Sequence, residues 1–284
     1  MGTYSFMIRP ESPMSTMLAV LAAVTYLAAG LRIARHLTHP PAERPARDTF
    51  ACVTVCCGVV LHAASIWPGL TLWSGPNPDL PTTISLAGLA TAAVFGIALL
   101  WRIDHVVGAL VLPLAAIAPL VPVAWPGQAI PAGAASAHIH AAISILTWAV
   151  LSLAALQALL LAWQEHRLRT KRPGGALRTL ASLDTQERWL FRLVGTGFFL
   201  LSLSLASGLM FVQDMLAQHL VHKTVLSCLA WAMFGALLWG HWRHGWRGQT
   251  AVRWCLSGFV VLAIAYFGSR LILEVLLEQR WYSA

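Results

Sequence analysis

Long apolar runs separated by short polar stretches set the pattern of hydrophobic and polar positions along the chain. A helix needs about 20 mostly apolar residues to cross the hydrocarbon core of a bilayer. The runs are continuous and lack the alternation of outer-membrane strands. The sequence therefore predicts an all-α polytopic membrane bundle, a single membrane domain over residues 1–284. Eight transmembrane helices are expected, over residues 15–37, 49–68, 82–101, 106–125, 137–163, 189–212, 223–242 and 251–273.

Composition supports the membrane prediction and excludes other classes. Hydrophobic residues make up 58% of the chain and charged residues 11%, whereas a soluble globular protein has about 25% charged residues. A chain this apolar cannot stay disordered in water. The five cysteines lie within apolar stretches and form no C-x-x-C pair, so neither a disulfide framework nor a zinc ribbon is predicted.

The basic residues predict an orientation in the membrane. Fifteen of the 19 Lys and Arg residues follow the first, third, fifth and seventh runs, and the longest of these loops covers residues 164–188. Basic loops stay in the cytoplasm, so both termini are expected on the outer, periplasmic side of a bacterial inner membrane. The net charge of +8 then reflects topology, and no nucleic-acid partner is expected.

Prolines mark the fourth run as unusual. Pro113, Pro119 and Pro122 lie within it, and prolines at such positions bend or partly unwind a helix. Ordinary helix packing is one interpretation of this bend. A substrate path in a small-molecule or ion transporter is a weaker one.

Histidine is the chemically unusual residue of this chain, with eleven copies against eleven acidic residues. His62 lies about 20 Å into the second predicted helix, a depth at which a polar side chain is a functional candidate. His140 is expected at a similar level in the fifth helix. His138 lies about 200° around that helix from His140, so only one of the two points into the bundle, and His140 is chosen.

Two imidazoles at one depth predict an iron site. His62 and His140 are the predicted axial ligands of a non-covalently bound haem b, since a membrane bundle supplies apolar surroundings for a porphyrin. His222, at the outer start of the seventh helix, is a further candidate near His140. The alternatives for His62 are an interhelical hydrogen bond, a proton relay, and a copper site with Cys52 and Cys56.

Arg270 is a candidate for anion binding near the outer end of the eighth helix. A guanidinium at this level suits a haem propionate. The alternative is an i,i+4 pair with Glu274 or a side chain that snorkels to the interface. No nucleophile elbow, phosphate-binding loop or paired-carboxylate site occurs in the sequence, so no enzymatic activity is expected.

Two stretches of the chain resemble a known family. HAAISILTWAVLSLAALQALLLAWQEHR, from His140 to Arg167, resembles the histidine-led helix of the cytochrome c assembly family, which includes the CcsA, ResC and HemX types. KTVLSCLAW, LLWGHWRHGWRG and AYFGSR, between Lys223 and Arg270, resemble the YpjD branch of that family. With the hydropathy pattern, the resemblance covers nearly the whole chain and is strongest over residues 138–273.

The resemblance implies a haem-binding protein of cytochrome c assembly or haem handling in the bacterial inner membrane. It implies that His140 matches an outer-face haem ligand and that His241 matches a family histidine at a helix end. It also places His62 where the YpjD type carries a histidine. Other assembly proteins or an apocytochrome are the implied partners, beside the lipid bilayer.

One departure from the family pattern bears on activity. The CcsA type carries a W-G-x-x-W-x-W-D signature between its sixth and seventh helices, and residues 213–222 here contain no tryptophan. Direct haem-ligase activity is therefore not expected. The second functional hypothesis is a cofactor-free, HemX-like regulator or scaffold that acts on a cytoplasmic partner through the basic loop 164–188.

Overall fold

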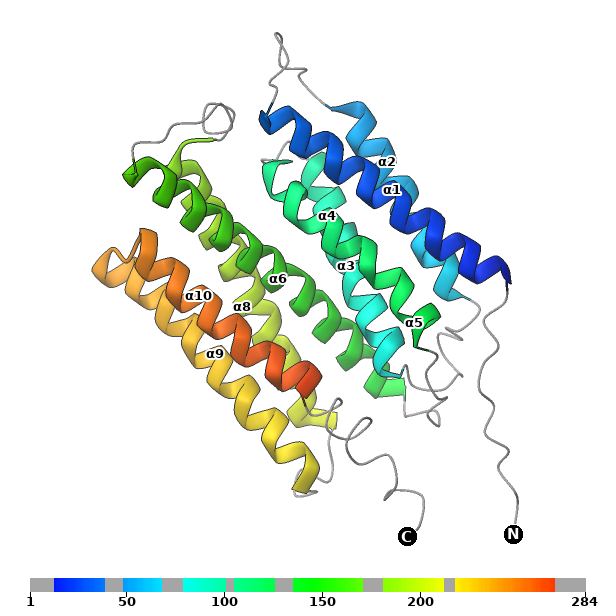
Figure 1. The fold of residues 1–284 in the computed structure, drawn as a ribbon. Coiled ribbons are helices and arrows are strands. Elements are labelled where there is room, and N and C mark those ends of the chain that lie inside the picture. The colour runs from blue at the N-terminus through cyan, green and yellow to red at the C-terminus, as the bar shows by residue number, and fades with distance from the viewer. Residues whose placement is uncertain are drawn as a thin grey trace, which may run out of the picture. The chain divides into compact units, whose positions relative to one another are not determined.

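The computed structural model describes residues 13–38, 48–67, 79–100, 105–125, 135–170, 181–211 and 218–268, and all regular elements within these ranges are helices (Figure 1). This confirms the predicted all-α class. The chain forms two compact units, one of residues 1–138 with 174–180 and one of residues 139–173 with 181–284. The single membrane domain stays a prediction.

In the first unit, α1 packs against α2 and α4, while α3 packs against α2 and α4 (Figure 1). Aspartates fix where two of these helices begin. Asp48 accepts a hydrogen bond from the backbone N–H of Ala51, and Asp79 accepts one from Thr82. Such caps satisfy backbone donors that a helix start leaves open. The helices are α1 (Pro13–Thr38), α2 (Thr49–Ile66), α3 (Leu80–Leu100) and α4 (Gly108–Ile117).

The fourth predicted run is helical but broken. A turn of 3-10 helix, η3 (Ala118–Leu120), separates α4 from the short α5 (Val121–Ala124). Pro119 and Pro122 cause the break, because proline lacks the N–H that continues the hydrogen-bond ladder. The predicted interruption is therefore confirmed.

The number of long helices differs by one from the predicted eight. Among the described residues, seven helices are long and apolar enough to cross a membrane, and Gly108–Ala124 is apolar but shorter. The run that the prolines interrupt is therefore the one without an unbroken helix long enough to cross a membrane. The chain is a multi-pass membrane protein, and the outer position of both termini stays a prediction.

The second unit has a core to which four helices contribute. Buried side chains from all four meet there, with Leu151 of α6, Leu190 of α8, Phe234 of α9 and Cys255 of α10 among them. Membrane helices associate largely through such close packing, because lipid is as apolar as the core itself. The helices are α6 (Ala135–Arg169), α8 (Leu183–Phe211), α9 (Gln218–His244) and α10 (Gly248–Ala263), and a π-helical turn, η4 (Ile264–Gly268), follows α10.

A tight hairpin joins α9 to α10. Gly245 and Gly248 adopt φ of +67° and +55°, a left-handed conformation that glycine tolerates. The Glu187 side chain of α8 accepts a hydrogen bond from the Gly248 N–H at 2.5 Å. Glu165 of α6 accepts one from the Gln249 side chain at 2.8 Å. Two carboxylates from neighbouring helices therefore hold the hairpin in place.

Candidate functional site

His62 lies in a fully buried polar cluster of the first unit. Its Nε2 is 2.9 Å from the Ser85 hydroxyl of α3, and its Nδ1 is 3.5 Å from the Tyr26 hydroxyl of α1. All three side chains have an exposed fraction of 0%. The predicted burial of His62 is thus observed, and both ring nitrogens face hydroxyl groups from other helices.

These contacts are interhelical hydrogen bonds, which were the predicted alternative to haem ligation by His62. A haem ligand needs a ring nitrogen that iron can reach, and the fully buried ring of His62 bonds Ser85 through Nε2. The role of His62 as an axial ligand stays a prediction. The copper alternative gains no support, because no group of three or more His, Cys, Asp or Glu side chains in the described ranges is placed to hold a metal.

His140 lies in a different setting, a serine cluster between α6 and α8 of the second unit. Its Nδ1 is 2.9 Å from the Ser207 hydroxyl. Its Nε2 has a long contact of 3.5 Å with the Ser144 hydroxyl, and Ser144 lies 2.7 Å from the Ser204 hydroxyl. The ring is half-buried, anchored through one nitrogen, and only weakly engaged at the other.

His241, at the other end of this unit, has a third kind of environment. Its Nδ1 lies 2.9 Å from the Trp246 carbonyl oxygen, so Nδ1 carries the hydrogen and donates it. The ring stacks on Phe191 with centroids 3.5 Å apart. These contacts link α8, α9 and the α9–α10 hairpin. His241 lies near the C-terminal end of α9, whereas His140 lies near the N-terminal end of α6.

The other predicted site residues are not placed by the structure. His222 belongs to the first turns of α9, and its side chain lies outside the described part of the chain. Arg270 also lies outside the described residues. Both stay predictions.

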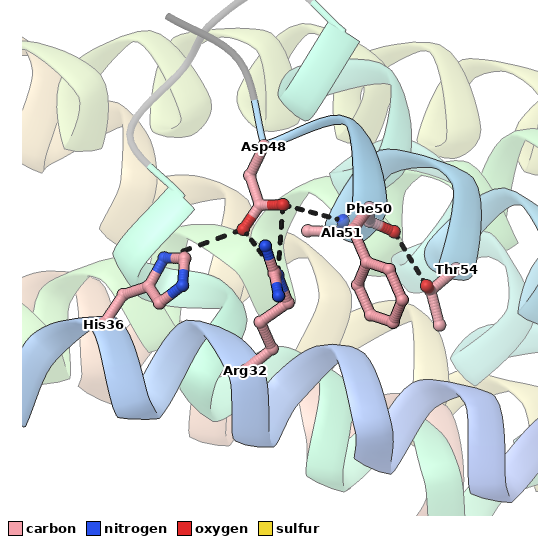
Figure 2. Close-up of polar contacts among 6 residues, drawn as sticks. All are labelled: Arg32, His36, Asp48, Phe50, Ala51 and Thr54. Atoms are coloured by element: carbon pink, nitrogen blue, oxygen red, sulfur yellow. Dashed lines mark hydrogen bonds and ion pairs between the residues drawn. The ribbon is translucent and has the colours of Figure 1, made fainter. Parts of the chain in front are cut away.

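An ion-pair cluster that was not predicted from the sequence joins α1 to the start of α2 (Figure 2). Arg32 Nε lies 3.0 Å from Asp48 Oδ2, and His36 Nδ1 lies 3.6 Å from the same oxygen. The Arg32 guanidinium also stacks over the exposed Phe50 ring at 4.7 Å. The signal in the sequence was an aspartate directly before a helix, preceded by basic residues at the end of the previous one.

The environment of Asp48 lowers its pKa. Partial burial acts in the opposite direction and is the largest single influence, but it is outweighed by the Arg32 and Ala51 hydrogen bonds and by the charges of Arg32 and His36. A carboxyl with a lowered folded-state pKa stabilises the fold above its unfolded-state value of about 3.9. That contribution is lost as the pH falls through the folded-state pKa.

We expect Asp48→Asn to remove this pH dependence. Asparagine keeps an acceptor for the Ala51 N–H but carries no charge, so the wild type is the more stable protein near neutral pH. The difference shrinks as the pH falls below about 4. Thermal unfolding of both proteins in detergent across this range measures it. A difference in stability between the two proteins that is the same at all pH values contradicts a stabilising role for the charge of Asp48.

Comparison with known proteins places the chain in a family. Inner membrane protein YpjD of Escherichia coli K12 is 36% identical over 138 residues, which cover 49% of this chain and 52% of that protein. An uncharacterised 28.8 kDa protein of Azospirillum brasilense is 33% identical over 181 residues, which cover 62% and 66%. Cytochrome c biogenesis protein CcsA of Gloeothece citriformis is 27% identical over 112 residues, which cover 39% and 34%.

The chain spans about half the length of the YpjD relatives that it matches. No solved structure matches it. The profile of the cytochrome c assembly proteins matches residues 105–277, more than half of the chain. This range includes His140, His222, His241 and Arg270, whereas His62 precedes it. The chain belongs to the cytochrome c assembly protein family.

Proposed function

We propose that this protein binds haem and acts in cytochrome c assembly or haem handling, with His140 as an iron ligand. Membership of the family supports a role in cytochrome c assembly, and the geometry of His140 supports its role as an iron ligand. The YpjD relative is named an inner membrane protein, and we assign this multi-pass chain to the same membrane. Its proposed partners are other assembly proteins or an apocytochrome, and no enzymatic activity of its own is proposed.

The anchored imidazole of His140 is the observation that carries the proposal. Metal-bound histidines commonly hold one ring nitrogen with a hydrogen bond while the other nitrogen faces the metal. In His140 the Ser207 hydroxyl lies 2.9 Å from Nδ1, and the contact between Nε2 and the Ser144 hydroxyl is longer, at 3.5 Å. His62 shows the same two distances, 2.9 Å at Nε2 and 3.5 Å at Nδ1, but its ring is fully buried, whereas the ring of His140 is half-buried and within reach of a ligand.

The surroundings of His140 also suit a porphyrin. The turns of α6 and α8 that carry His140 and Ser207 expose apolar side chains, among them Ile139, Leu209 and Met210, and a porphyrin ring requires such apolar contacts. Haem, when bound, supplies an iron that takes axial nitrogen ligands and changes oxidation state. His222 and Arg270 remain proposed contributors to this site, whereas His241, at the other end of the unit, would belong to a separate one. Ligation by His62 requires loss of its bond to Ser85.

Optical spectra of the full chain test the proposal. We expect detergent-purified wild type to contain about one haem with a low-spin spectrum, and His140→Ala to lose the band or become high-spin. His138→Ala, two residues away, is the matched control and is expected to keep the wild-type spectrum. Pyridine haemochrome assays give the haem content.

Haem-free wild type, even after growth with excess haem precursor, overturns the proposal. It favours instead the cofactor-free regulator that acts through loop 164–188. Charge reversal in that loop then changes the phenotype, and histidine replacement does not.

A further inference from the structure

The hydrogen bonds around His140 determine which of its ring nitrogens carries a proton. The Ser207 hydroxyl donates to the Ser204 carbonyl oxygen at 2.9 Å. A hydroxyl has one hydrogen to donate, so while that hydrogen is on the Ser204 carbonyl, Ser207 Oγ accepts from the ring nitrogen 2.9 Å away. In this arrangement Nδ1 of His140 carries the hydrogen, and Nε2 of the neutral ring carries the lone pair.

A second serine pair lies beside that lone pair. The Ser144 hydroxyl is 2.7 Å from Ser204 Oγ and 3.5 Å from His140 Nε2. Its single hydrogen bonds either Ser204 or Nε2, and the shorter contact is the better hydrogen bond. Rotation of one hydroxyl thus switches Nε2 between a weak hydrogen bond and an open lone pair, while the ring stays in place.

A glycine makes room for the ring on α8. A Cβ atom at Gly208 would lie 3.3 Å from His140 Cε1 and 3.8 Å from Nδ1. The first distance is tighter than an ordinary carbon contact, so any side chain here pushes the imidazole. Ser204, Ser207 and Gly208 therefore form one surface of α8 that fixes both the position and the tautomer of His140.

We propose that Ser207 sets the tautomer of His140 and that Ser144 is a reversible cover on Nε2, so that the site binds and releases an electron-pair acceptor. The acceptor class is a metalloporphyrin iron. This last step rests on the proposed function, whereas the tautomer is a property of the haem-free chain. Ser144, Ser204 and Ser207 are positioning residues that act through His140.

Nitrogen NMR of histidine-labelled, haem-free protein at alkaline pH tests the tautomer. Wild type is expected to show the Nδ1–H form at His140. Ser207→Ala removes the acceptor and is expected to shift the ring toward Nε2–H, the form that histidine favours in water. Ser202→Ala is the matched control, because Ser202 also lies on α8 and donates to a carbonyl of its own helix, that of Phe198, but accepts from Trp231 and not from His140. It is expected to change nothing at His140.

Wild type in the Nε2–H form, or a Ser207→Ala spectrum like that of wild type, overturns the inference. These results are independent of haem. A chain that shows Nδ1–H but binds no haem upholds the tautomer assignment and overturns the proposed function alone.

Haem transfer tests the role of the serines in ligation. Loss of a hydrogen-bond partner behind a metal ligand costs about 10- to 100-fold in affinity. Transfer of haem from loaded protein to apomyoglobin is therefore expected to be about 10- to 100-fold faster in Ser207→Ala than in wild type or Ser202→Ala. Ser144→Ala is expected to slow the transfer, because no hydroxyl then competes for Nε2. Equal transfer rates in all four proteins overturn the role in ligation.

Discussion

Replacement of His62 by alanine is expected to destabilise the first unit by roughly 2 to 4 kcal/mol while haem binding at His140 persists. The imidazole is fully buried and contacts hydroxyls of α1 and α3. Its removal leaves a cavity and takes a partner from Ser85 and Tyr26. A buried polar group without a partner costs about 1–3 kcal/mol.

Thermal unfolding in detergent measures this loss, and a double-mutant cycle with Ser85→Ala isolates the pair. Hydrogen bonds between membrane helices give coupling energies of about 0.6 kcal/mol, with a maximum of about 1.7 kcal/mol. We expect a value in that range for His62 and Ser85. The haem content of the folded fraction is measured in parallel. Loss of haem from folded His62→Ala would instead make His62 the second axial ligand.

The burial of His62 could be predicted from the sequence, but its partners could not. Position along an apolar run fixes depth, because a helix rises about 1.5 Å per residue. The partners Tyr26 and Ser85 lie 36 and 23 residues away in other helices. Hydropathy does not show which helices pack together, so the choice between ligand and hydrogen bond depended on tertiary contacts.

Helix ends were less predictable than helix centres. The fifth run was predicted to end at residue 163, but α6 continues to Arg169, and α8 begins at Leu183 instead of residue 189. The extra turns are polar, so hydropathy does not mark them. Local bonds support them: an ion pair between Glu165 and Arg169 at 2.6 Å and a Ser182 cap on the Thr185 N–H.

The candidate site, too, could be predicted only in part from the sequence. His140 could be identified from its place at the start of an apolar helix, whereas its serine neighbours were missed. The S-L-S-L-A-S-G run, from Ser202 to Gly208, was a usable signal, because small and hydroxylated residues at such spacing line one helix surface. Pairing that surface with His140 still required the contact between α6 and α8.

Replacement of Gly58 by alanine is expected to destabilise the first unit by about 1–3 kcal/mol, the usual cost of overpacking. A Cβ atom at Gly58 would lie 2.7 Å from the Tyr26 ring and 2.8 Å from Thr25 Oγ1. Neither side chain can yield freely. Tyr26 is fully buried, and the Thr25 hydroxyl donates to the Ala22 carbonyl at 2.8 Å.

Gly195→Ala is the matched control for Gly58→Ala, because nothing lies within 4 Å of a Cβ at that position of α8. Alanine favours a helix over glycine by about 1 kcal/mol, so this variant is expected to unfold at or above the wild-type temperature. Equal unfolding temperatures for the two variants contradict close packing at Gly58.

Gly58 and His62 are also expected to be coupled. A methyl group at residue 58 displaces the Tyr26 ring, and with it the hydroxyl that faces His62 Nδ1. Once His62 is alanine, the displaced hydroxyl has no imidazole to lose, so Gly58→Ala should cost less in that background. Unfolding of the double variant measures the difference. Strict additivity would mean that the α1–α2 contact and the buried polar cluster are independent features of the unit.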